Sequence, residues 1–121
     1  MSTEPAMTVI TAFVRPRMEA RVIHPLHDLP EFPGFFVSEV RGQGRGYGSG
    51  GSYEATESDL TYLRFLQIQL VCRADAAETV RQKIAEAAWT GRKGDGVIFS
   101  TDAGSFLRIR QAIGQPGGHQ Q

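Results

Sequence analysis

The chain of 121 residues contains a single cysteine and carries no excess of charge of either sign. Because Cys72 is alone, no intrachain disulfide can form, and nothing in the composition calls for an oxidising compartment. Lys plus Arg and Asp plus Glu both number 13, which argues against a protein that coats nucleic acid or an anionic membrane. The sequence also lacks a long apolar run and a basic segment followed by one. We therefore expect no membrane span, no signal peptide and a cytoplasmic location.

What is present is enough for one ordinary domain, with a hydrophobic fraction of 40%. The apolar pattern predicts a strand at Thr8–Val14, a helix at Met18–Leu29, strands at Phe35–Arg41 and Tyr62–Cys72, a helix from Asp75 to Gly91, and short strands at Val97–Ser100 and Phe106–Ile109. Pro25 should kink or shorten the first helix, and Asp75 with Glu78 resembles a capping box on the second. This order predicts an α+β, ferredoxin-like βαββαβ fold with an antiparallel sheet.

The segment at residues 42–60 differs in composition from the rest of the chain. It is rich in glycine and has no Ile or Val, so it cannot bury enough surface to offset the entropy of ordering. We expect a long flexible loop here, inside a domain that spans residues 8–113. Residues 1–7 and 114–121 should form a disordered N-terminus and a flexible tail.

Two motifs could bind an anion. Thr90–Gly96 places glycines beside Arg92 and Lys93, which suits close approach of a backbone to an anion, although the same residues also make an ordinary helix stop and turn. In the predicted last strand, Arg108 and Arg110 would project from one face about 7 Å apart and could hold a phosphate or carboxylate. The alternative for this pair is a solvated strand face.

The same segments resemble the PII signal-transduction (nitrogen regulatory protein P-II) family. Thr90–Phe99 (TGRKGDGVIF) with Leu107–Arg110 (LRIR) is similar to the family's second signature and its arginine pair. Val37–Arg45 resembles the entry to the family's T-loop, and Phe13–Pro16 the start of its first helix. The resemblance runs from about Thr8 to Ile113. It implies a homotrimer with clefts between subunits that bind an adenine nucleotide (AMP, ADP or ATP).

Carried over by position, the resemblance implies roles for particular residues. The T-loop edge of the cleft would be formed by Gly42, Gly44 and Arg45, with Val71 near the base. The phosphates would meet Gly94, Asp95 and Gly96, and also Arg108 and Arg110 from the neighbouring subunit. Phe65 and Val97 stand where classical members carry phosphate-binding lysines, which implies that a mono- or diphosphate should compete well with ATP.

The resemblance also implies a regulator and not an enzyme, and no nucleophile–base set is visible in the sequence. A protein partner, such as a membrane transporter, would read the T-loop, and no nucleic acid is expected as a partner. The glycine spacing of the T-loop entry is similar to PII-like proteins associated with heavy-metal efflux. His24, His27 and Asp28 therefore offer an alternative function, a divalent-metal site on one helix face. A third interpretation is an interaction module with a vestigial cleft.

Overall fold

The computed structural model describes residues 5–43 and 62–114, so predictions that concern the rest of the chain lie outside the described residues. Four antiparallel strands form one sheet in the order β2-β3-β1-β4. The strands are β1 (Met7–Val14), β2 (Phe36–Gly42), β3 (Leu63–Arg73) and β4 (Gly96–Asp102). The helix α1 (Glu19–Leu26) connects β1 to β2, and α2 (Ala77–Ala88) connects β3 to β4. The predicted α+β ferredoxin-like fold is therefore confirmed.

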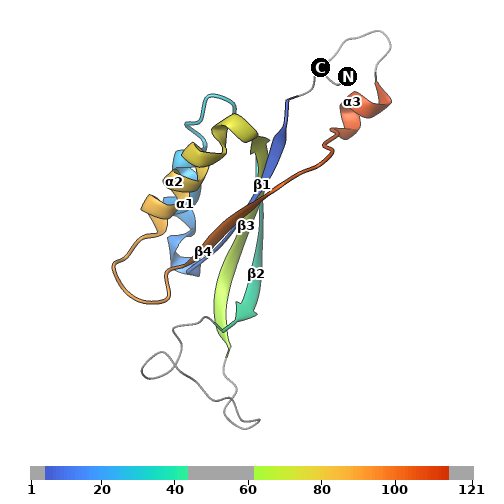
Figure 1. The fold of residues 1–121 in the computed structure, drawn as a ribbon. Helices are drawn as coiled ribbons and strands as arrows, with labels where there is room; N and C mark the ends of the chain where they lie inside the picture. Colours follow the sequence, from blue (N-terminus) through green and yellow to red (C-terminus); the bar gives the residue numbers. More distant parts are fainter. Residues whose placement is uncertain (1–4, 44–61, 115–121) are drawn as a thin grey trace.

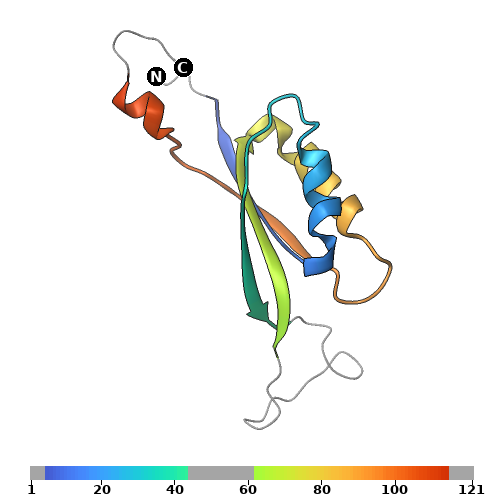
Figure 2. The same ribbon diagram turned by 180° about the vertical axis from the view of Figure 1, so that it is seen from behind.

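The core lies between the sheet and the two helices, which cover the same face of it (Figures 1 and 2). On β3, Leu66, Ile68 and Leu70 alternate into this core, each 4% exposed or less, as the period-2 pattern predicts. The helices contribute the other side of the core through Val22, Leu26, Val80 and Ile84. This alternation fixes the register, because a slip of one residue would turn the apolar set of β3 toward solvent.

The opposite face of the sheet is covered by neither α1 nor α2. The strand register places one apolar set on this open face: Val9, Phe13, Phe36, Val40, Phe65, Val71, Val97 and Phe99. Phe36 is 80% exposed and Val97 57%. Polar groups lie among them, and the Gln69 amide donates a hydrogen bond to Thr11 Oγ1 at 3.1 Å. Such a large apolar surface on one chain is typical of a face that another chain covers.

Pro25 shortens the first helix, as predicted. After the one-turn 3-10 helix η1 (Pro16–Met18), α1 runs to Leu26 instead of the predicted Leu29. The amides of His27 and Asp28 then bond to carbonyls three residues earlier, at 3.2 and 3.0 Å. A proline in the last turn supplies no N–H to the ladder, so the chain tightens and leaves the helix.

The capping box predicted for α2 is wrong. Asp75 lies in a one-turn 3-10 helix, η4 (Ala74–Ala76), and α2 begins after Ala76 without a side-chain cap. The Asp75 carboxylate instead accepts hydrogen bonds from Arg73 Nε and Nη2, at 3.2 and 2.9 Å. The bidentate guanidinium holds the pKa of Asp75 below its ordinary value, which shows where this carboxylate is engaged.

The strand predicted at Phe106–Ile109 is also wrong. After β4 the chain leaves the sheet, and Ile109–Ile113 forms the short helix α3 (Figure 1). Arg108 is extended and Arg110 helical, so the two arginines do not project from one strand face. An alternating pattern forms a strand only where a neighbouring strand accepts its hydrogen bonds, and β4 pairs with β1 alone within the described residues.

Candidate ligand-binding site

The loop between α2 and β4 is organised around the Asp95 carboxylate. It accepts hydrogen bonds from the backbone N–H of Thr90 at 2.8 Å and from the Thr90 hydroxyl. Arg15, which follows β1, donates from Nε to the same carboxylate at 3.4 Å. These bonds, those of Thr90 first and then that of Arg15, lower the pKa of Asp95. The carboxylate is therefore committed to holding its own loop.

The packing of this loop requires glycine at two positions. Gly94 and Gly96 have φ of +86° and +120°, where a side chain is strained. A Cβ on Gly94 would lie 2.9 Å from Arg15 Nη2. A Cβ on Gly96 would overlap the carbonyl oxygen of Phe13 and lie 2.9 Å from its carbonyl carbon. The glycine pattern is thus required by the end of β1, whatever the loop binds.

A cavity of about 590 Å³ lies where this loop meets the end of β2. It brings together four of the predicted nucleotide-binding residues: Gly42, Gly94, Asp95 and Gly96. Its other lining residues are Phe13, Val40, Arg41, Gln43, Phe65 and Val97. Their side chains give the cavity mainly apolar walls on the open sheet face, with one guanidinium. We call this the loop cavity.

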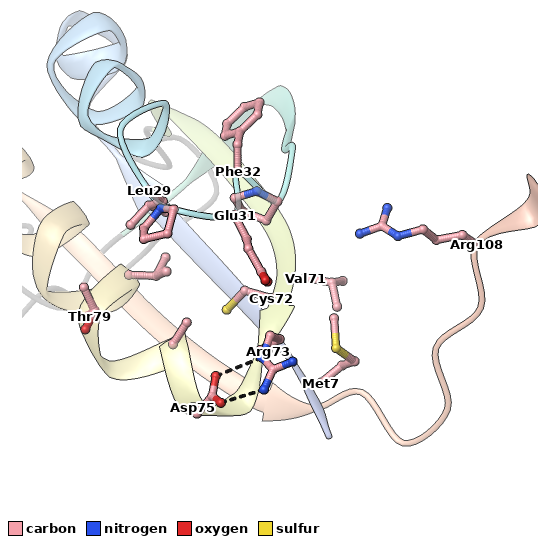
Figure 3. A pocket seen from close by; sticks show the side chains of 14 residues that line it. Met7, Leu29, Glu31, Phe32, Val71, Cys72, Arg73, Asp75, Thr79 and Arg108 are labelled. Atoms are coloured by element: carbon pink, nitrogen blue, oxygen red, sulfur yellow. Dashed lines mark hydrogen bonds and ion pairs between the residues drawn. The ribbon is translucent and has the colours of Figure 1, made fainter. Parts of the chain in front are cut away.

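Arg108 and Val71 lie elsewhere, around a second cavity of about 610 Å³. Figure 3 shows Arg108 extending toward Val71 and Glu31, with Phe32 and Leu29 on the far side. Met7, at the other end of β1 from the loop cavity, also lines it. Arg110 lines neither of these two cavities.

The two cavities are at opposite ends of the sheet. Gly96 pairs with Val14, the last residue of β1, whereas Met7 is its first. Seven strand steps separate these ends by about 23 Å, so Arg108 of one chain cannot reach an anion at Gly94 and Gly96 of the same chain. Gly44 and Arg45, the remaining predicted contacts, lie outside the described residues.

The predicted metal site is not formed. Within residues 5–43 and 62–114, no three His, Cys, Asp or Glu side chains are close enough together to hold a metal ion. His24 and His27 remain one helical turn apart, because His27 has αR dihedrals and its amide bonds to the His24 carbonyl at 3.2 Å, but with Asp28 they do not form a group of three that could hold a metal ion. His27 stacks on Phe32 with ring centroids 4.4 Å apart, while His24 lines a groove between α1 and α2.

Cys72 is a core residue, 6% exposed. Burial raises the pKa of its thiol, and the nearby Asp75 carboxylate raises it further. The nucleophilic thiolate is therefore disfavoured at neutral pH.

The sequence pattern did not indicate that Arg15 contacts the loop between α2 and β4. The signal available was the dipeptide Arg15-Pro16, because a proline keeps the preceding residue extended, and Arg15 has φ −67° and ψ 138°. The partner of that side chain, 80 residues away, could not be read from the pattern.

The split βαβ sheet, with one helix-covered face and a glycine loop before β4, defines a small ferredoxin-like domain. Its fold matches the crystal structure of Arabidopsis thaliana PII bound to citrate with a TM-score of 0.69 and 27% identity, over 92% of this chain and 90% of the other. Residues 7–112 match the family model "Nitrogen regulatory protein P-II". The chain belongs to the PII family.

Individual relatives agree with this assignment. The nitrogen regulatory protein P-II of Azospirillum brasilense is 34% identical over 93% of this chain and 97% of its own. Nitrogen regulatory protein GlnK of Escherichia coli (strain K12) is 30% identical over 86% and 92%. Proteins of this family are regulators without enzymatic activity that respond to small effector ligands, so this chain is a signalling protein. No helix of the described residues has the length and apolar character of a membrane span.

Proposed function

We propose that the chain is a nucleotide sensor that works as a homotrimer and controls a protein partner through the loop between β2 and β3. The observation that carries this proposal is the division of the predicted binding residues between the two ends of the sheet. Gly42, Gly94 and Gly96 line the loop cavity, and Arg108 lines the other. A site that uses both sets needs a second copy of the chain.

The open sheet face supports self-association. Phe36 on β2 and Val97 and Phe99 on β4 are between 48% and 80% exposed and lie on one face of the sheet. At about 25 cal/mol for each Å² of apolar surface buried, covering such a face is a strong drive to assemble. Light scattering should give about three times the 13.3 kDa mass of the chain, and a monomer would contradict the shared site.

The ligand proposed is an adenine nucleotide with one or two phosphates. Gly94 and Gly96 bring the backbone close to the loop cavity, while Phe65 and Val97 add apolar groups to the same wall. The outer phosphates of ATP would find few charged partners there, whereas a single phosphate would lose less. Titration calorimetry should therefore give similar affinities for AMP, ADP and ATP. A large preference for ATP would refute this reading of Phe65 and Val97.

Arg108→Ala tests the contribution of the second copy. Losing one charged donor in a partly desolvated cleft should cost about 2 kcal/mol, or roughly thirtyfold in affinity. Arg92→Ala is the matched control, because Arg92 is an exposed arginine of the loop that does not line the loop cavity. Equal losses of affinity in both variants would show that the overall positive charge, and not a specific contact of Arg108, attracts the nucleotide.

A mixing experiment tests whether the site is shared. Val97→Asp places a negative charge in the loop cavity, and Arg108→Ala disables the other end. Each variant alone should bind nucleotide poorly. Trimers refolded from an equal mixture should regain part of the binding, because some clefts then combine two intact halves. No recovery would mean that both residues act within one chain.

The response would pass to a partner, for example a membrane transporter, through the β2–β3 loop. Arg41, Gly42 and Gln43 line the loop cavity directly before residue 44, where that loop continues. A ligand that touches these three residues in one loop state and not in another shifts the equilibrium between the states. Pull-down of partners with and without AMP or ADP would test this coupling.

A further inference from the structure

We propose that Arg15 is the positioning residue of the ligand site, holding the loop at residues 90–96 in the form that faces the loop cavity. This rests on the proposed function for the identity of the ligand, but the placement of the loop can be tested without any ligand. Arg15 is not among the residues that line the loop cavity, whereas its partner Asp95 is.

The guanidinium of Arg15 makes two contacts with the loop. Nε donates to the Asp95 carboxylate at 3.4 Å, and Nη2 donates to the backbone carbonyl of Lys93. The side chains of Arg15 and Asp95 are 29% and 19% exposed, so the pair is partly shielded from water and is less screened than an ion pair on the surface. One planar group thus bonds both a side chain and the backbone, which a lysine ammonium could not do in the same geometry.

The glycine at position 94 belongs to the same arrangement. Its missing side chain leaves the space that Nη2 of Arg15 approaches, and an added Cβ would lie 2.9 Å from that atom. Gly96 is held against the Phe13 carbonyl in a similar way. Phe13 and Arg15, at and just after the end of β1, therefore pack against the loop at the residues before and after Asp95.

Arg15 is itself held in place by its neighbours in the chain. Val14 pairs with Leu66 and Gly96 in the sheet, and Pro16 keeps Arg15 extended at the start of η1. The guanidinium thus extends from a rigid strand end toward a loop whose residues 91–94 are exposed. Binding an anion to this loop costs less when the loop is already in position.

The first test follows amide exchange in the free trimer. Arg15→Gln should speed exchange across residues 90–97 about fivefold or more, because local opening becomes easier, while residues 68–71 of β3 keep their protection. Arg17→Gln is the matched control: Arg17 is exposed in η1, two residues after Arg15, and makes no ion pair among the described residues. Unchanged loop exchange in Arg15→Gln would overturn the proposal.

The second test measures AMP and ADP affinity by calorimetry. Arg15→Gln should weaken binding about tenfold, Arg15→Lys should weaken it less, and Arg17→Gln should leave it unchanged. For Arg15→Gln and Asp95→Asn, the loss in the double variant should be clearly smaller than the sum of the two single losses, since both substitutions remove the Arg15–Asp95 contact. Additive losses, or equal losses in the Arg17 control, would contradict the proposal.

The two tests separate the proposals. If the unaltered protein binds neither AMP nor ADP, the proposed function fails, and the exchange experiment still decides whether Arg15 places the loop. If nucleotide binds normally and Arg15→Gln weakens it without changing loop exchange, Arg15 acts on the ligand directly. That result would overturn the positioning role and leave the proposed function intact.

Discussion

Gly96→Ala should be one of the most damaging single-methyl substitutions in this protein. The new Cβ would lie 2.9 Å from the Phe13 carbonyl carbon and 3.3 Å from Val14 Cα, and would overlap the Phe13 oxygen. These distances are well inside the 3.5–4.0 Å at which carbon atoms pack, so β4 must move away from β1. The residue also sits at φ +120°, where alanine is strained.

The magnitude follows from adding these two effects. Strain at a positive φ costs about 1–3 kcal/mol, and the displaced Val14–Gly96 pair adds to it, so we expect a loss of roughly 3 kcal/mol. For a domain of this size that corresponds to a fall of about 10 °C in Tm. Thermal and urea unfolding should be compared at one protein concentration, because the stability of an oligomer depends on it.

Gly104→Ala is the matched control for this substitution. Gly104 also has a positive φ, +76°, but a Cβ there would meet nothing within 4 Å. Gly104→Ala should lower the free energy of unfolding only by the backbone strain, about 1 kcal/mol. If Gly96→Ala is no more destabilising than Gly104→Ala, the loop does not pack against the end of β1 as described.

Three further predictions concern charge and core. Hydrogen bonds from Thr90 and then Arg15 hold the pKa of Asp95 below its ordinary value, so its contribution to folding stability is present above the unfolded pKa and lost as the pH falls through the lower folded pKa. The stability difference between the unaltered protein and Asp95→Asn should therefore shrink on acidification in urea titrations, and a difference that grows would refute it. Ile84→Ala empties a fully buried site and should cost about 2–5 kcal/mol in the same assay, whereas a loss below 1 kcal/mol, about that of an exposed site, would contradict its place in the core. Glu39→Gln removes an ion pair whose Arg64 and Glu39 side chains are 70% and 69% exposed; it should change stability by less than about 0.5 kcal/mol, and a larger loss would mean that another chain covers the pair.

The order of strands and helices could be predicted from the sequence because it depends on local periodicity. Leu66, Ile68 and Leu70 alternate in the sequence and are buried together in the structure, and α2 buries Val80 and Ile84 at helical spacing. The predictions were wrong where a local sequence pattern is compatible with two structures. Asp75 could cap a helix or pair with Arg73, and the two-residue spacing of Arg108 and Arg110 suits a strand only where a partner strand exists.

The sequence by itself therefore determined the fold class, the buried face of the sheet and the two glycines of the loop. Only the tertiary structure decided which residues meet. It placed Gly42 and Gly96, which lie on the two edge strands, around one cavity and separated both from Arg108 by the length of β1. It also joined Arg15 to Asp95 across 80 residues of chain. The physical reason is that periodicity records which way a side chain faces, whereas contacts between distant segments depend on how whole strands pair and pack.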